Sequence, residues 1–232
     1  MPALILVTCV LLVVLAVVWS SRRALQRQAH IREFVLPPGL FEKLRRHHPQ
    51  LTTKDCQLVA QALRQFFMAY LRGGRRPVSM PSQVVDDLWH EFILYTRHYE
   101  RFCSQAFGRF LHHTPAVVLS GQQASDAGLR RCFWWACRQE NINPRQPTRL
   151  PLLFAIDRKL AIVGGFHYAL DCQALRGAAQ AGGDGAIVYC AGDISSSTGS
   201  GGDAFGDGAG SGDGGGDGGG DGGGCGGGCG SE

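Results

Sequence analysis

The chain has 232 residues, of which 44% are hydrophobic and 18% are charged, and its formal net charge is +4. Residues 1–181 carry 23 Lys and Arg against 11 Asp and Glu, whereas residues 182–232 carry eight acidic residues and no basic one. No nucleic-acid motif accompanies the basic part, so we expect its positive charge to meet anionic lipid headgroups and expect no nucleic-acid partner.

An uninterrupted apolar run from Ala3 to Trp19 opens the chain. As a helix its 17 residues would extend about 26 Å, close to the thickness of the hydrocarbon core of a bilayer. Trp19 followed by Arg22 and Arg23 is typical of a membrane interface. The basic residues before the run and the small residues after it that mark a cleaved signal peptide are lacking. We therefore predict a retained transmembrane anchor over residues 1–21, a cleaved signal being the alternative.

The basic residues nearest the run all follow it, and residues 22–36 form a basic juxtamembrane segment. The positive-inside rule then predicts a single-pass protein with its N-terminus outside and the following domain in the cytoplasm. The 20 Arg against three Lys indicate a GC-rich bacterial genome, so the expected location is the bacterial inner (cytoplasmic) membrane. We expect membrane lipids to bind the N-terminal helix and the basic segment.

Helical periodicity dominates the domain predicted over residues 37–176. It predicts helices over 40–48, over 53 to about 71 with a threonine cap, over 81 to about 106, over 126–139 and over 152–160. No segment shows sustained two-residue alternation, so few strands are expected. The predicted fold class is all-α, a bundle of five or six helices behind one N-terminal transmembrane helix.

Residues 177–232 are predicted to be a disordered, acidic tail rich in Gly and Asp, because they offer too little apolar surface to offset the entropy of ordering. Cys225 and Cys229 in this tail could meet a soft metal ion or form a disulfide, the alternative being incidental thiols on a flexible chain. The acidic tail could also fold back onto the basic domain and mask its charge.

The segment from Met80 to Pro115 contains the chemically most interesting residues, among them two adjacent carboxylates and four histidines. On one continuous helix, the apolar residues fall on a single core face. Asp87 and His90 fall together on a second face, flanked by Leu94. With aromatic residues on the remaining side, we expect this pair to be enclosed by protein, and buried polar groups need partners.

Three interpretations of Asp87 and His90 stay open. In the structural one, Asp87 accepts a hydrogen bond from His90 or caps the helix, and the pair holds a buried junction. In a metal site, both side chains are ligands, and His112 or His113 returns from the loop after Gly108 with a third ligand for zinc or another divalent metal. In the catalytic one, Asp87 orients His90 as a general base.

Three segments between about Pro37 and Asp171 stand out, VDDLWHEFILYTRHYERFC, GRFLHHTP and LPLLFAIDRKLAIVGGF, and a glycine-rich end follows them. In these segments the chain resembles the glycine-rich domain-containing protein-like family, in its bacterial form. Plant members of that family have Trp-His-x-His, whereas Glu91 and Phe92 follow His90 here, so the second histidine of the plant pattern is absent. The resemblance implies the fold and its boundaries, and it implies no particular reaction.

No GxSxG, HExxH, GxxxxGKS or kinase signature is present in the chain. The first expected function is therefore a membrane-anchored cytoplasmic helical interaction module with a protein partner. The alternative is a metal-binding domain or metal-dependent hydrolase that uses Asp87, His90 and His112 or His113. The sequence does not decide whether the protein is an enzyme.

Overall fold

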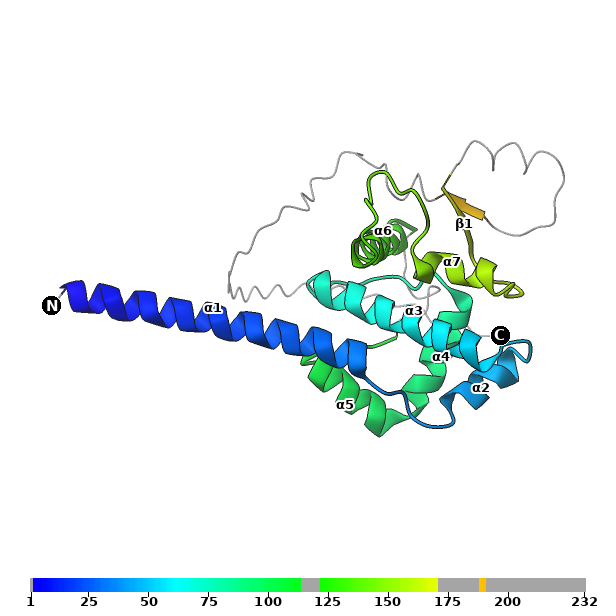
Figure 1. The fold of residues 1–232 in the computed structure, drawn as a ribbon, viewed down its shortest axis with the longest axis horizontal. Coiled ribbons are helices and arrows are strands. Elements are labelled where there is room, and N and C mark those ends of the chain that lie inside the picture. Colours follow the sequence, from blue (N-terminus) through cyan, green and yellow to red (C-terminus); the bar gives the residue numbers. More distant parts are fainter. Residues whose placement is uncertain (1, 114–121, 171–187, 191–232) are drawn as a thin grey trace, which may run out of the picture. The chain divides into compact units, whose positions relative to one another are not determined.

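The described part of the computed structural model, residues 2–113, 122–170 and 188–190, consists of seven helices and one pair of short strands (Figure 1). The elements are, in chain order, α1 (Pro2–Glu33), α2 (Leu40–His47), α3 (Thr53–Arg72), α4 (Gln83–Leu94), α5 (Thr96–Phe107), α6 (Gln122–Gln139), α7 (Leu152–Lys159), β1 (His167–Ala169) and β2 (Val188–Cys190). Six described helices follow the apolar one, so the predicted all-α bundle is confirmed.

The two strands pair in parallel, with Tyr168 of β1 opposite Tyr189 of β2. β2 falls inside the segment that the sequence assigns to the acidic tail, residues 177–232. The rest of that segment, with Cys225 and Cys229, lies outside the described residues.

The N-terminal helix α1 is continuous through both the apolar run and the basic segment after it. Its apolar side chains from Leu4 to Trp19 are exposed, and the helix extends away from the others at its N-terminal end (Figure 1). It is long and apolar enough to cross a membrane, a property that signal sequences share. Only its C-terminal part packs on the bundle, where Ile31 is fully buried.

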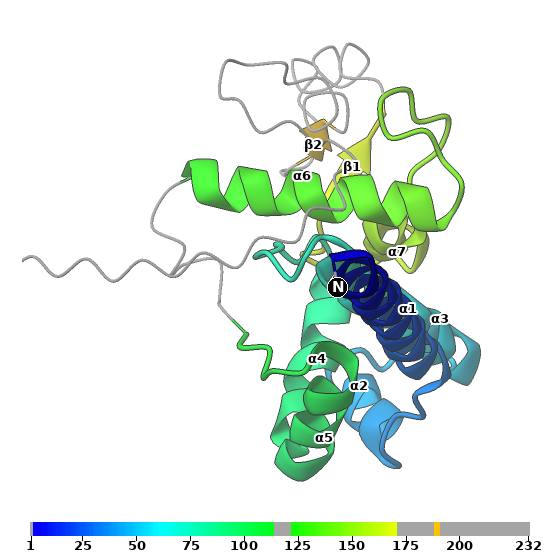
Figure 2. The ribbon, with the colours of Figure 1, turned by 90° about the vertical axis from the view of Figure 1, so that its left-hand side faces the viewer.

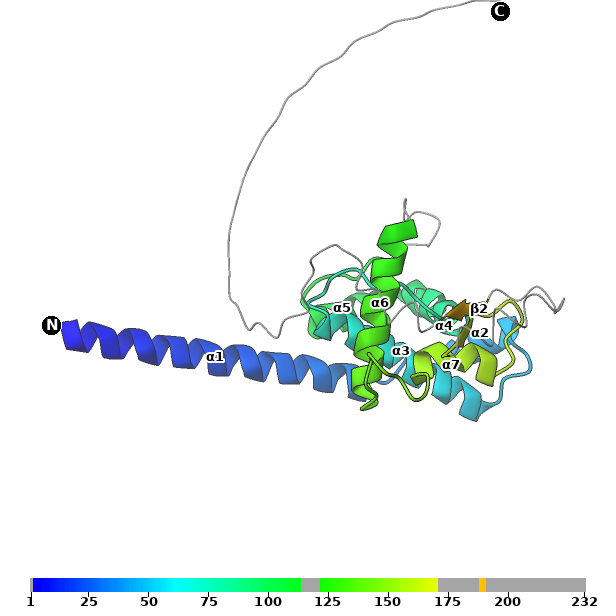
Figure 3. The same ribbon diagram turned by 90° about the horizontal axis from the view of Figure 1, so that it is seen from above.

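Helix α3 is the centre of the bundle and is in contact with α1, α2, α4, α6 and α7. Its start is a capping box, because the Thr52 hydroxyl accepts from the Asp55 N–H and the Asp55 carboxylate accepts from the Thr52 N–H, which confirms the predicted threonine cap. The Thr52 hydroxyl and the Thr52 backbone N–H both donate to the Asp55 carboxylate, and these two hydrogen bonds hold the pKa of Asp55 below its usual value. Helix α6 runs steeply across α3 (Figures 2 and 3).

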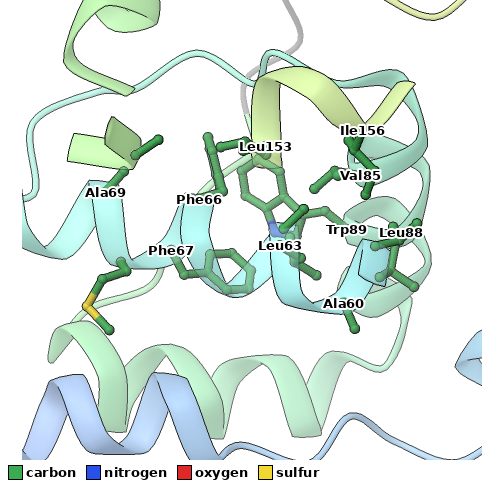
Figure 4. Packing of buried hydrophobic residues seen from close by; sticks show 14 of the residues in the cluster. Ala60, Leu63, Phe66, Phe67, Ala69, Val85, Leu88, Trp89, Leu153 and Ile156 are labelled. Carbon is green, nitrogen blue, oxygen red and sulfur yellow. The ribbon is translucent and has the colours of Figure 1, made fainter. Parts of the chain in front are cut away.

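A cluster of aromatic rings from α3, α4 and α5 lies in the core. The ring centroids of Phe66 and Phe67 lie 5.0 and 5.9 Å from that of Trp89, and Phe67 also packs on Phe102 at 4.9 Å. Leu153 of α7 closes this cluster from the other side of α3 (Figure 4). Offset and edge-on contacts of this kind add to the stabilisation from burial alone.

The predicted single helix from residue 81 to about 106 is wrong, because the structure breaks it between α4 and α5. Tyr95 has a non-helical backbone, with φ −81° and ψ 58°, and its hydroxyl donates to the carbonyl of Pro38. The break lets α5 fold back, so that the Tyr99 ring packs edge-on against Phe92 at 5.2 Å. A helical wheel with one constant angle per residue continues through such a break and cannot detect it.

A buried carboxylate of α7 fixes the start of α4. Asp157, 1% exposed, accepts from the Ser82 hydroxyl at 2.6 Å and from the backbone N–H groups of Gln83, Val84 and Phe166. The first N–H groups of a helix lack partners within the helix, and a negative charge there is favoured by the helix dipole. Asp157 therefore orients α4, the helix on which the candidate site lies.

Candidate metal centre

Three carboxylates of α4 each meet a histidine. Asp86 meets His113, Asp87 meets His48, and Glu91 meets His47. Two of these histidines come from the end of α2 and one from the segment after α5, so two separate parts of the chain converge on α4. Asp86 differs from the other two carboxylates because a second histidine, on its own helix, also reaches it.

The cluster around Asp86 brings three metal-ligand types together. His113 Nε2 lies 2.8 Å from Asp86 Oδ1, and His90 Nδ1 lies 3.5 Å from Asp86 Oδ2 and 2.9 Å from the Asp86 carbonyl oxygen. The two imidazole centroids are 4.1 Å apart. One ligand atom from each of the three residues lies within 4.8 Å of the others.

Local structure explains how the cluster forms. Asp86 and His90 are four residues apart on α4, and such residues are neighbours on a helix surface. His113 lies next to Asp86 because Gly108, with φ +72°, ends α5 in the left-handed conformation, and the chain can then reverse its direction. The returning segment is fixed where the Tyr99 hydroxyl donates to the Leu111 carbonyl at 2.6 Å.

Two buried aromatic side chains hold His113 in place. The indole N–H of Trp89 donates to the Tyr99 hydroxyl at 3.1 Å, and the Trp89 ring packs on the His113 imidazole with centroids 4.5 Å apart. Burial, with Cys103 as a smaller contributor, raises the pKa of Tyr99, so its hydroxyl stays protonated and remains a hydrogen-bond donor. The core of the bundle thus positions one ligand of the cluster.

The cluster is closed on the His113 side and open on the His90 side. The exposed fractions of the side chains are 13% for His113, 24% for Asp86 and 52% for His90. The exposed His90, with Leu94 exposed at 66% beyond it, corrects the expectation that this face is enclosed by protein. An open side leaves room for water or another ligand on a bound ion.

Two imidazole nitrogens and one carboxylate oxygen are donors that Zn²⁺ and other divalent transition-metal ions accept. Ligands about 2.0–2.2 Å from a zinc ion lie roughly 3.4 Å from one another in a tetrahedron. The ligand atoms of the three residues lie within 4.8 Å of one another, so a bound ion would have to draw them somewhat closer together. The three residues therefore fit a divalent metal ion.

Of the four metal ligands expected from the sequence, His90 and His113 lie together, and Asp87 and His112 lie elsewhere. Asp87 Oδ2 is 2.7 Å from Nε2 of the buried His48, and Asp87 Oδ1 accepts from the Gln83 amide. The Asp87–His48 pair joins α2 to α4. His112 is exposed and packs on Phe110.

A second contact between α2 and α4 lies beside the Asp87–His48 pair. Glu91 pairs with Lys43 at 3.2 Å and with His47 at 3.3 Å. Burial acts to raise the pKa of Glu91, but the hydrogen bonds and charges of Lys43 and His47 outweigh it, so the pKa lies below its usual value. The contacts of Asp87 and of Glu91 hold α2 on α4, and none of them involves a residue of the Asp86 cluster.

Sequence reasoning missed Asp86 and His48. Asp86 and His90 are four residues apart, a spacing that makes two side chains neighbours on a helix. Asp87 and His90 are three residues apart, which does the same, so spacing alone does not choose between the two carboxylates. His48 follows a short helix and precedes Pro49, a position where a histidine is usually solvated, and only the docking of α2 on α4 buries it.

The chain belongs to the UCP032817-like family, whose model matches residues 26–194. The match begins after the apolar part of α1 and includes every described element from α2 to β2. Neither curated proteins nor solved structures gave a match. The family match names no activity, and the resemblance to the glycine-rich domain-containing protein-like family stays a prediction.

Proposed function

We propose that this member of the UCP032817-like family is a membrane-tethered helical domain that binds a divalent transition-metal ion at Asp86, His90 and His113. The observation that carries the metal site is the convergence of three donor atoms within 4.8 Å. The 3.5 Å between His90 Nδ1 and Asp86 Oδ2 is long for a hydrogen bond, so this carboxylate oxygen has capacity for an ion. A zinc ion would use all three side chains at once.

The tether in this proposal is α1. Its exposed apolar surface would be costly in water and favourable in a bilayer, and Trp19 with the arginines after it suits the interface. The distribution of arginines supports an N-terminus outside and a domain in the cytoplasm of a bacterial inner membrane. Resistance of the membrane-bound chain to alkaline carbonate extraction tests the tether. Protease protection of the C-terminal domain in sealed right-side-out vesicles tests the orientation.

The metal site is tested on the full chain purified in a nonionic detergent. Elemental analysis measures the metal that the purified protein carries, and calorimetric titration of the metal-free protein measures its affinity for zinc. Asp86→Asn and Asp87→Asn form a matched pair of adjacent isosteric changes. Loss of even an outer-shell partner of a metal site costs about 10–100-fold in affinity. We therefore expect a loss at least that large for Asp86→Asn and an affinity close to wild type for Asp87→Asn.

Two outcomes overturn the metal assignment. One is substoichiometric zinc, iron and manganese in the purified chain together with no calorimetric zinc binding. The other is equal zinc binding by wild type and Asp86→Asn. Either outcome would leave the interaction module expected from the sequence, in which the histidine–carboxylate contacts hold helices together and a protein partner carries the function.

A further inference from the structure

A cleft of about 740 Å³ lies where the C-terminal half of α1 meets the end of α3 and the side of α6. Its volume is within the range of ligand pockets in proteins. Figure 2, which looks along α1 from its N-terminal end, shows α6 crossing beside α1 and α3. Five of the twelve lining residues are arginines, and none is Asp or Glu. They are Arg23, Arg27, Arg72, Arg75 and Arg138.

Three of these guanidinium groups have neutral partners. Arg72 donates to the Gln28 amide oxygen, and Arg75 donates to the Phe107 carbonyl oxygen, each at 2.9 Å. Arg23 lies over the Trp19 ring at 4.7 Å. Within residues 2–113 and 122–170, no ion pair joins any of the five arginines to a carboxylate. The cleft therefore carries positive charge that the described protein does not neutralise.

The arginines are also close enough to repel one another. Burial lowers the pKa of Arg27, and the neighbouring charges of Arg75 and Arg23 lower it further. Burial likewise lowers the pKa of Arg72, with Arg32 and Arg138 adding to the effect. Mutual repulsion of this kind is relieved when an anion binds among the guanidinium groups.

The position of the cleft along α1 indicates where such an anion comes from. Trp19 ends the exposed apolar run, and the lining of the cleft begins with Trp19 and Ser20 and continues to Gln28. If α1 crosses a bilayer, tryptophan at the end of the apolar run lies at the level of the headgroups. The end of the cleft that Trp19 lines then lies where lipid phosphates are concentrated.

We propose that this cleft binds the phosphate group of an anionic phospholipid from the membrane that α1 crosses. Arginine suits this ligand because its planar guanidinium donates two parallel hydrogen bonds to phosphate oxygens. Basic pockets beside transmembrane helices on the cytoplasmic side are typical sites for anionic headgroups. The inference rests on the membrane tether of the proposed function and is independent of the metal site.

The test uses the full chain purified in dodecyl maltoside, with native mass spectrometry to count bound dioleoylphosphatidylglycerol against dioleoylphosphatidylcholine. The variant is Arg72→Gln/Arg138→Gln. The matched control, Arg45→Gln/Arg46→Gln, removes the same charge from exposed positions of α2. Helix α2 directly precedes the start of α3, whereas Arg72 is at its end, about 30 Å away. If the double variant does not fold, the single variant Arg138→Gln replaces it, because Arg138 is exposed on α6.

The proposal is supported if wild type and control retain phosphatidylglycerol in preference to phosphatidylcholine, and if the Arg72→Gln/Arg138→Gln variant retains at least about tenfold less phosphatidylglycerol. Equal retention by the cleft variant and the control overturns it. Displacement of the bound lipid by millimolar glycerol phosphate also overturns it, in favour of a soluble phosphate ester. Flotation of the chain with pure phosphatidylcholine vesicles measures the tether without any anionic lipid. A chain that does not float has no tether, whereas a chain that floats but does not prefer phosphatidylglycerol lacks only the lipid site in the cleft.

Discussion

His113 Nε2 lies 2.8 Å from Asp86 Oδ1, although the two residues are 27 positions apart in the chain. This contact exists because α5 ends at Gly108 and the chain returns along α4. It places the largely buried imidazole of His113 beside the exposed imidazole of His90, with the Asp86 carboxylate within reach of both.

Zinc should stabilise the folded chain, because a ligand that binds only the native state raises the free energy of unfolding. At a free zinc concentration about 100 times the dissociation constant the gain is about 2.7 kcal/mol. For a chain of this size that gain corresponds to a rise in Tm of roughly 5–10 °C. His113→Ala should abolish the shift, measured by circular dichroism, and His112→Ala should keep it. A shift retained in His113→Ala would contradict the assignment of this ligand.

Tyr99→Phe should weaken zinc binding without removing a ligand. The change deletes the hydroxyl that donates to Leu111 and accepts from Trp89, and leaving those buried groups unpaired costs about 1–3 kcal/mol of stability. Because Leu111 is two residues before His113, the loosened segment should also lower zinc affinity, by about tenfold. Tyr95→Phe, whose hydroxyl bonds Pro38 away from the cluster, is the control. Calorimetric affinities equal in both variants would show that Tyr99 does not position His113.

Asp157→Ala should destabilise the chain by about 3 kcal/mol or more, because it leaves several buried donors at the start of α4 without an acceptor. Asp157→Asn should also destabilise it, since an amide group would face N–H donors. Lys159→Ala, an exposed position on the same helix, should change little. Urea unfolding followed by far-UV circular dichroism measures all three, and a small effect of Asp157→Ala would show that this cap does not hold α4.

His30 should make the chain less stable in mild acid. Burial lowers the pKa of His30, and its Nε2 atom is buried without a hydrogen-bond partner among the described residues. The folded chain therefore resists a proton that the unfolded chain accepts near pH 6.5, so this contribution to stability is lost as the pH falls below that value.

His30→Phe should remove this pH dependence, because the new ring fits between Phe34 and Phe102 and carries no proton. The difference in Tm between His30→Phe and wild type should grow from pH 7 to pH 5. His98→Phe, the same change at an exposed histidine, should leave the pH dependence as it is in wild type. A constant difference for His30→Phe over this range would assign the acid sensitivity to other groups.

Local patterns in the sequence were enough to find most of the helices, although not the break between α4 and α5. The apolar run predicted α1, helical periodicity predicted α2, α3, α6 and α7, and the threonine before α3 predicted its cap. Each of these features depends on residues within one or two turns of each other, where spacing alone decides which side chains meet. The candidate metal site could be located to the segment around α4 for the same reason.

Tertiary structure decided which residues form that site. Asp86 and Asp87 are adjacent and chemically alike, and only the docking of α2 assigns Asp87 to His48 and leaves Asp86 for His90 and His113. Likewise, the path of the chain after Gly108 selects His113 over His112. Contacts between residues far apart in sequence depend on how helices dock and where they break, and those events are set by the packing of the whole core rather than by any local spacing.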